Sequence, residues 1–205
     1  MNKSKLMYLF AFISATALLI AASNVTAEDS VVEWTVDEER SSISFTSEAP
    51  AEKIVGTSEE VTGTIKWNNA RTSQTTAELS FPVNSMRTGN SLRDRHLTEE
   101  DWLNASENPD VRFTVTGLED VRVARSENRT DYRATAVGTV ELNGVEHPNK
   151  ASVEIAILPE RKVARIRPTL EFRLADHNVR GADGVVGTEV GKVIEVEGLI
   201  YANWE

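Results

Sequence analysis

The chain has 205 residues, enough for one ordinary domain, and it carries 32 Asp and Glu against 22 Lys and Arg, a formal net charge of −10 at pH 7. A surface this acidic repels nucleic acid and anionic lipid headgroups, which excludes DNA or RNA binding and electrostatic docking to membranes. The absence of cysteine excludes disulfides, thiol catalysis, cysteine-based metal sites and a lipid anchor on an N-terminal cysteine.

The N-terminal segment has the three regions of an export signal. Lys3 and Lys5 precede an apolar run, Leu6 to Ala22, and small residues follow at Val25 to Ala27. The alternative is a membrane anchor, but a run of about 17 residues is at the lower limit for spanning a bilayer. We therefore expect residues 1–27 to be a signal peptide and residues 28–205 to be the exported domain. Its removal takes away two Lys and no acid, so the net charge becomes −12.

Apolar and polar residues alternate with period two along most of the remaining chain, and helical periodicity is almost absent. This pattern is typical of antiparallel strands with one buried and one solvated face. The alternating apolar sets, in chain order, are Ile43 and Phe45; Val61 to Trp67; Ala77 to Val83; Val111 to Val115; Tyr132 to Leu142; Val153 to Ile157; Ala164 to Leu174; and Ile194 to Ile200.

These sets indicate about eight strands in one all-β domain. Turn residues separate them at Asn68-Asn69, Glu127-Asn128, Asn143-Gly144, Pro159-Glu160 and Asp183-Gly184. No helical pattern lies between the strands, so a parallel sheet is not expected. About eight antiparallel strands form either a closed barrel or a sandwich, and the pattern alone barely separates the two. Within the Ala164 set, Pro168 lacks a backbone donor, which predicts an edge or a bulge there.

Residues 84–110 interrupt the alternation. Thr98 and Asp101 resemble the start of a capping box, with Glu99 and Glu100 in the first turn. One or two brief helical turns are therefore expected around residues 90–105. A long insertion between two strands of a small barrel often serves as a lid or a plug.

The inward positions differ in size. Gly63, Ala134 and Gly138 are small, whereas Phe113 and Phe172 are large. Small inward residues can leave room for a ligand, or they can simply offset large neighbours in a filled core. Both interpretations stay open at this point. An apolar bore would gain roughly 0.8 kcal/mol for each ligand CH₂ group that it buries.

Four stretches of the sequence resemble the YceI-like family, also called the polyisoprenoid-binding family. They run in the same order over residues 34–200, and the central one is the most specific. The stretches are Trp34 to Asp37 with Ser41 to Phe45; Thr88-Gly89-Asn90, Arg93-Asp94, His96-Leu97, Asp101-Trp102-Leu103 and Pro109; Gly138 to Val145 with His147-Pro148; and Leu174 to Val179 with Val190-Gly191 and Ile194 to Gly198.

The resemblance implies a single eight-stranded antiparallel, lipocalin-like barrel that is exported to the periplasm or secreted. It also implies that a long isoprenoid or a similar amphiphile binds in the bore, without catalysis. Two departures affect positions near the expected pocket or its rim. Residues 55–61 lack the aromatic residue of the family's usual Gly-x-Phe pattern, and Glu146-His147 replaces the usual Thr-Lys before proline.

Arg93, Asp94 and His96 form the tightest cluster of chemically capable residues. On one interpretation they surround the pocket mouth, where Arg93 and His96 donate hydrogen bonds to a diphosphate or quinone oxygen. On the other, Arg93 and Asp94 pair with each other or cap the insert, and His96 is structural. The predicted ligand-binding set adds apolar inward residues and residues of the insert: Phe45, Leu79, Phe81, Met86, Arg93, His96, Leu97, Trp102, Phe113, Leu142, Phe172 and Leu174.

Catalytic and metal sites are not expected. The histidines His96, His147 and His177 show no metal-ligand spacing, although the fold could bring them together. The sequence lacks the Gly-x-Ser-x-Gly elbow of hydrolases and a glycine-rich phosphate loop after a strand. No cofactor is predicted.

Three functions remain. The leading hypothesis is a protein that carries or sequesters a polyisoprenoid or quinone-like lipid in the bacterial envelope. The alternative is an envelope stress or interaction module with a filled barrel and no ligand. A third is an enzyme that acts on a lipid headgroup through Arg93, Asp94 and His96. The oligomeric state stays open, with a homodimer among the alternatives.

Overall fold

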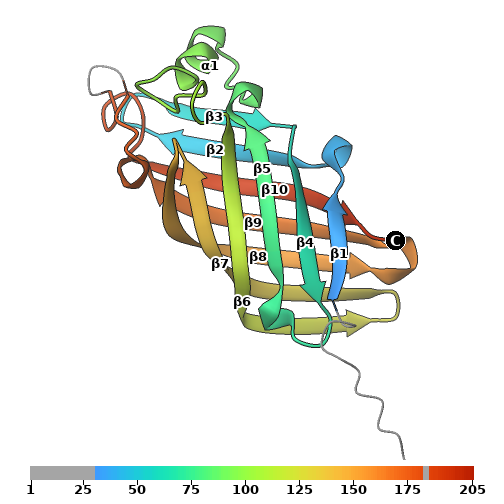
Figure 1. Ribbon diagram of the computed structural model, residues 1–205. Coiled ribbons are helices and arrows are strands. Elements are labelled where there is room, and N and C mark those ends of the chain that lie inside the picture. Colours follow the sequence, from blue (N-terminus) through green and yellow to red (C-terminus); the bar gives the residue numbers. More distant parts are fainter. Residues whose placement is uncertain (1–30, 182–184) are drawn as a thin grey trace, which may run out of the picture.

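The computed structural model describes residues 31–181 and 185–205, and its strands form one antiparallel sheet curved into a barrel (Figure 1). The expected signal peptide and the Asp183-Gly184 turn lie outside the described residues. The strands are β1 (Val31–Val36), β2 (Ser42–Glu48), β3 (Lys53–Ser58), β4 (Thr62–Asn68), β5 (Thr76–Pro82), β6 (Asp110–Ser126), β7 (Arg129–Leu142), β8 (Val145–Leu158), β9 (Val163–Arg173) and β10 (Val193–Asn203).

Helical structure in the described residues is short. It comprises the α-helix α1 (Ser91–Leu97) and the 3₁₀ turns η2 (Glu38–Arg40), η3 (Thr72–Gln74), η4 (Val83–Ser85), η5 (Pro159–Arg161) and η6 (Leu174–His177). None of these helices is long and apolar enough to cross a bilayer.

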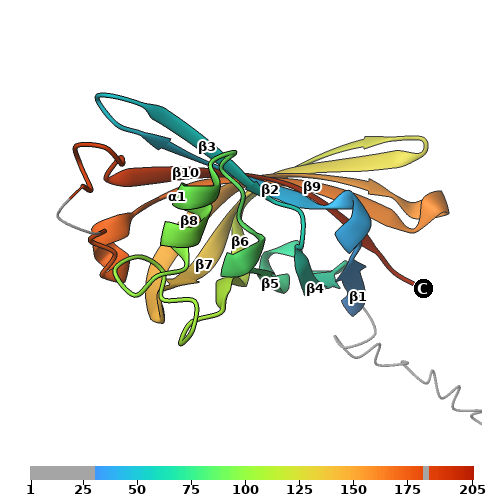
Figure 2. The same ribbon diagram turned by 90° about the horizontal axis from the view of Figure 1, so that it is seen from above.

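Eight strands close the ring. The sheet runs β1-β4-β5-β6-β7-β8-β9-β10, and β10 returns to β1 through the pairs Thr35–Asn203 and Val36–Ala202. β2 and β3 form a hairpin that pairs with the other half of β10, beyond β1. The predicted eight-stranded antiparallel barrel with a short helical insert is confirmed. Seen from above, the β2–β3 hairpin and the far part of the β6–β7 hairpin project from the barrel (Figure 2).

β1 and β2 pair with successive parts of β10, and Ser41 stabilises the break between these two strands. The 3₁₀ turn η2 separates the two strands, and the backbone of Tyr201 faces the break. The buried Ser41 hydroxyl accepts a hydrogen bond from Tyr201 N at 3.0 Å and donates to the Asp37 carbonyl oxygen at 2.6 Å. A buried backbone N–H needs a partner, so this side chain replaces the missing ladder bond.

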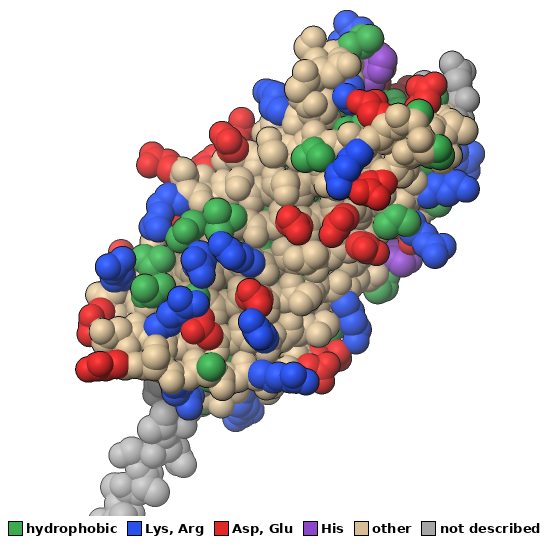
Figure 3. All heavy atoms as spheres, turned by 180° about the vertical axis from the view of Figure 1, so that it is seen from behind, with side chains coloured by type: hydrophobic (Ala, Val, Ile, Leu, Met, Phe, Trp, Pro, Cys, Tyr) green, Lys and Arg blue, Asp and Glu red, His purple; other side chains and the backbone are tan. Residues whose placement is uncertain are grey.

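The strand pattern of the sequence is largely observed. In β9, for example, Ala164, Ile166 and Leu170 are buried while Arg167 and Glu171 are exposed. On the outer surface, acidic and basic side chains are interspersed over the face seen in Figure 3. Two strands have no counterpart among the predicted alternating sets, β1 and β3. The inner face of β3 is formed by Ile54, Gly56 and Ser58, and this mixed set gives little apolar signal.

The prediction for Pro168 needs correction. β9 is an interior strand of the ring, between β8 and β10, so Pro168 is not at an edge. The pairing of β9 with β10 breaks off opposite Gly198 and resumes at Ile166–Ile200 in the same register, so the interruption is not a bulge. A Cβ at Gly198 would crowd the proline ring. The absence of a side chain at Gly198 therefore leaves space for the Pro168 ring within this interior strand.

Gly138 marks a close approach between β6 and β7. It pairs with Val115, where the register of the two strands shifts, and an added Cβ would overlap the Thr114 carbonyl oxygen. We expect Gly138→Ala to lower the free energy of unfolding by about 1–3 kcal/mol, because strand backbone must move. Urea unfolding measures the change. Thr139→Ala, on the outer face, is the control and should stay within about 0.5 kcal/mol of the wild type.

The helical insert begins earlier than the sequence suggested. Asn90 is the N-cap of α1, and its side-chain oxygen accepts hydrogen bonds from Leu92 N and Arg93 N. Thr98 is the C-cap and its hydroxyl donates to the Arg95 carbonyl oxygen, so the predicted start at Thr98 is wrong. Asn is as common an N-cap as Thr, and the capping-box pattern had pointed only to Thr98.

One end of the barrel is filled by aromatic rings. Trp34 stacks on Trp67 with ring centroids 4.9 Å apart and on Trp204 at 5.2 Å, and Tyr132 meets Trp67 edge-on at 4.9 Å. Trp34 and Trp67 are almost fully buried. We call these four residues the aromatic plug. They lie on β1, β4 and β7 and just after β10, at the barrel end where β10 finishes (Figure 1).

Candidate functional site

The opposite end of the barrel is hollow. A cavity of about 430 Å³ lies between the inner faces of β2, β5, β6, β9 and β10, with α1 and the following loop beside it. This volume is in the range of small-molecule pockets. None of the four residues of the aromatic plug lines it. The inward residues therefore form a filled core at one end of the barrel and line a cavity at the other end.

Partial exposure of inward apolar side chains supports an open cavity. Leu79, Phe81, Phe113, Phe172 and Val196 lie on the inner face of the sheet, yet each remains partly exposed. In a filled core such residues would be fully buried, as Ile65 and Ile200, which do not line the cavity, are.

Each of the twelve residues predicted from the sequence lines this cavity. They are Phe45, Leu79, Phe81, Met86, Arg93, His96, Leu97, Trp102, Phe113, Leu142, Phe172 and Leu174. Their contact with a ligand stays a prediction. The structure adds residues that the prediction missed, among them Ile43, Glu52, Ile54, Val61, Leu170, Val179, Val190 and Val196. Strand alternation could have supplied Ile43, Leu170 and Val196, whereas nothing in the sequence pointed to Glu52.

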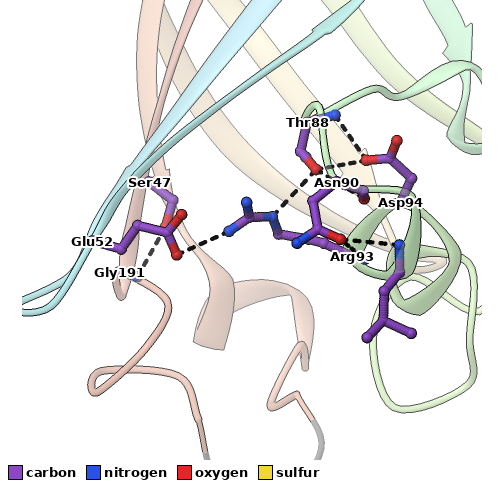
Figure 4. Close-up of polar contacts among 8 residues, drawn as sticks. Ser47, Glu52, Thr88, Asn90, Arg93, Asp94 and Gly191 are labelled. Carbon is purple, nitrogen blue, oxygen red and sulfur yellow. Dashed lines mark hydrogen bonds and ion pairs between the residues drawn. The ribbon is translucent and has the colours of Figure 1, made fainter.

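Polar side chains at the mouth of the cavity form a connected set (Figure 4). Arg93 Nε donates to Thr88 Oγ1 at 3.2 Å, and Arg93 Nη1 reaches Glu52 Oε2 at 3.1 Å. Thr88 Oγ1 donates to Asp94 Oδ1 at 2.6 Å, and Thr88 N donates to the same oxygen at 2.7 Å. Arg93 and Asp94 thus share Thr88 and do not pair directly. The carboxylate partner of Arg93 comes from the tip of the β2–β3 hairpin.

The backbone also ties the hairpin to the insert. Thr57 N donates to the Arg87 carbonyl oxygen and Arg87 N donates to the Thr57 carbonyl oxygen, both at 2.8 Å. Beneath this bridge, the buried hydroxyls of Ser58 and Ser85 lie 2.6 Å apart. These contacts join β3 to the segment before α1, next to the polar mouth.

The second arginine of the lining is also paired. Arg112 Nη1 contacts Glu141 Oε2 at 3.2 Å and Nη2 contacts Asp110 Oδ2 at 3.1 Å. The hydrogen bond and charge of Glu141 raise the pKa of Arg112 further above its usual value. His96 lines the cavity, and its side chain makes no hydrogen bond or ion pair with the described residues.

His177 is buried behind the cavity wall. Its Nδ1 lies 2.9 Å from the Val145 carbonyl oxygen, and its Nε2 has no partner in the described part of the chain. Its ring meets Phe172 edge-on at 5.3 Å and lies 6.0 Å from the ring of His147. Burial lowers the pKa of His177 below its ordinary value of 6.5, and the nearby His147 lowers it further. The neutral ring donates from Nδ1 to Val145.

This histidine predicts acid sensitivity. Because its pKa is lower in the folded protein than in the unfolded chain, the unfolded chain takes up the proton more readily. The stabilisation is complete above about pH 6.5 and is lost as the pH falls below that value. We expect the free energy of unfolding to decrease from pH 7.5 to pH 5. His177→Phe should flatten this part of the profile, whereas the exposed His147→Gln should weaken the slope only in part. An unchanged slope in His177→Phe would contradict the assignment.

The described residues contain no group of three or more His, Asp or Glu side chains placed to hold a metal ion. His147 and His177 are neighbours, whereas His96 lies on α1 at the cavity.

A closed antiparallel barrel, solid at one end and hollow with an apolar lining at the other, has the architecture of the lipocalin-like barrels. Comparison with known protein families identifies the family to which this barrel belongs. The family model of the YceI-like domain matches residues 34–200, and the chain belongs to this family.

Curated relatives are distant. A UPF0312 protein of Pectobacterium atrosepticum is 25% identical over 150 residues, which cover 71% of this chain and 73% of the relative. The protein YceI of Salmonella arizonae is 26% identical over 152 residues, which cover 71% of this chain and 74% of that protein.

Solved structures share the fold. BcnA of Burkholderia cenocepacia superposes with a TM-score of 0.68 at 17% identity, over 82% of this chain and 99% of BcnA. A polyisoprenoid binding domain from Saccharophagus degradans, implicated in plant cell wall breakdown, superposes with a TM-score of 0.67 at 15% identity. That match covers 85% of this chain and 99% of the domain.

Proposed function

We propose that the protein binds a long apolar amphiphile, a polyisoprenoid or quinone-like lipid, in the hollow end of the barrel and carries or sequesters it in the bacterial envelope. The cavity of about 430 Å³ is the observation that carries this proposal. Its walls are mainly apolar strand residues, and its polar groups gather at the mouth between the β2–β3 hairpin and α1. Such an arrangement suits a hydrocarbon tail inside and an oxygen-bearing headgroup outside.

Burial of the tail supplies the affinity. Each CH₂ group transferred from water into the cavity contributes roughly 0.8 kcal/mol, so about ten such groups would suffice for micromolar binding. The membership of the YceI-like family supports a lipid-type ligand, as does the shared fold with a polyisoprenoid binding domain. The signal-like segment at residues 1–27 supports export to the periplasm or beyond.

The alternative, an interaction module, assumed a barrel packed solid. The cavity and the partly exposed inward side chains do not fit that assumption. The proposal is therefore a binding protein, without a catalytic role for Arg93, Asp94 or His96. Arg93 and Asp94 position the mouth through Thr88 and Glu52.

Native mass spectrometry of the protein purified from its own envelope tests the proposal. We expect a bound mass that organic extraction identifies as a long-chain isoprenoid at stoichiometric amount. An empty protein that also takes up neither added quinones nor polyprenyl lipids would overturn the proposal and favour the interaction module.

A further inference from the structure

Two arginines line the cavity among the described residues, and each forms an ion pair with a carboxylate. Arg93 is bound to Glu52, and Arg112 is bound to Glu141 and Asp110. Lysine is absent from the described lining, and Glu189 adds a further acid. A phosphate or diphosphate headgroup is held in proteins by arginine that presents its N–H groups in pairs. At this mouth such a headgroup would have to displace Glu52 first.

The hydrogen bonds of Arg93 hold it in this paired position. Thr88 Oγ1 accepts from its Nε, and the Thr88 hydroxyl is in turn committed to Asp94. The Arg93 side chain is 25% exposed, whereas that of Glu52 is 55% exposed. The partly buried Arg93 guanidinium is therefore held in position without a ligand. The more exposed Glu52 carboxylate pairs with it from the tip of the β2–β3 hairpin (Figure 4).

An uncharged oxygen suits this pair. A hydroxyl can donate to the Glu52 carboxylate and accept from a free N–H of Arg93, and a quinone carbonyl can accept from Arg93. Neither requires the ion pair to break. An anionic headgroup instead meets Glu52 and Glu189 at the mouth of a chain whose overall charge is already −10.

We propose that Glu52, by pairing with Arg93 across the cavity mouth, selects amphiphiles with an uncharged oxygen headgroup, an alcohol or a quinone, over those with a phosphate or diphosphate. This assignment rests on the proposed lipid-binding function and specifies its ligand class. Glu52 is thus a specificity-determining residue on the β2–β3 hairpin, and Arg93 is the group that it occupies.

Two lipids with one tail test the assignment, geranylgeraniol and geranylgeranyl diphosphate. Their dissociation constants are measured by isothermal titration calorimetry at constant ionic strength, because salt screens exposed charges. The wild type should bind the alcohol at least tenfold more tightly than the diphosphate. Glu52→Gln should shift this ratio toward the diphosphate by at least fivefold, because it frees Arg93 while keeping the shape of the side chain.

Two further variants separate the local effect from the overall charge. Glu197→Gln makes the same change in net charge on the exposed outer face of β10, and its ratio should match the wild type. In the double variant Glu52→Gln with Arg93→Gln, the gain for the diphosphate should disappear, because the freed cation is gone.

The outcomes distinguish a failure of the proposed lipid binding from a failure of the proposed role of Glu52. If the wild type binds neither lipid, the proposed function fails and the headgroup assignment fails with it. If it binds both lipids equally, or if Glu52→Gln leaves the ratio unchanged, lipid binding stands and the role of Glu52 is overturned. An equal shift in Glu197→Gln would also overturn it, since overall charge would then explain the preference.

Discussion

Replacing Val196 with Trp should weaken binding of an isoprenoid tail by about 10- to 100-fold, because the indole would occupy space that the ligand needs. Val196 lies on the inner face of β10 between Phe45 and Leu170, lines the cavity and is partly exposed to it. Excluding two or three CH₂ groups from the cavity costs about 1.6–2.4 kcal/mol at roughly 0.8 kcal/mol each. Titration with geranylgeraniol measures the loss.

Val193→Trp is the matched control. It makes the same substitution on the same strand, but Val193 is 42% exposed and is not part of the cavity lining. Its affinity for the alcohol should equal that of the wild type. If Val196→Trp also bound like the wild type while remaining folded, the ligand would lie elsewhere and the cavity would not be the binding site.

Replacing Trp34 with Ala should cause a large loss of stability. The ring is 2% exposed at the centre of the aromatic plug, where it stacks on both Trp67 and Trp204. Truncation of a buried Trp to Ala typically costs about 3–5 kcal/mol, through lost burial and the cavity left behind. Chemical unfolding monitored by circular dichroism gives the change in the free energy of unfolding.

The same variant separates stability from binding. Trp34 does not line the cavity, so the folded fraction of Trp34→Ala should keep its affinity for the ligand. Trp102→Ala should show the reverse, since Trp102 is partly exposed and lines the mouth. We expect it to lose less stability and more affinity. A similar loss of stability in both variants would show that the two ends of the barrel are not distinct.

Much of the architecture could be predicted from the alternation of residues. The Ala164 to Leu174 set and the Ile194 to Ile200 set became β9 and β10, and the Asn143-Gly144 pair became a hairpin turn with both residues at positive φ. The break in alternation after Val83 became the helical insert. Period-two patterns report which face of a sheet a side chain occupies, and they identified seven of the twelve predicted cavity residues, whereas the other five were predicted from the insert.

The position of a helix cap was harder to predict. Thr98 was the predicted N-cap, but Asn90 also suits an N-cap, and its side chain accepts from Leu92 N and Arg93 N. The segment before α1 is joined to β3 by the Thr57–Arg87 bridge, and Asp94 within the helix accepts hydrogen bonds from Thr88. These contacts support a helix that begins at Ser91.

The sequence by itself determined the all-β class, the order of most strands, the place of the insert and the inward face of the strands that it predicted. Only the tertiary structure decided that the aromatic plug fills one end of the barrel and leaves the other hollow, and that Glu52 takes Arg93 as its partner. The reason is physical. Alternation records the side of a strand on which a residue lies, whereas depth along the barrel axis and pairing between residues 41 positions apart depend on the strand register and tilt of the closed sheet.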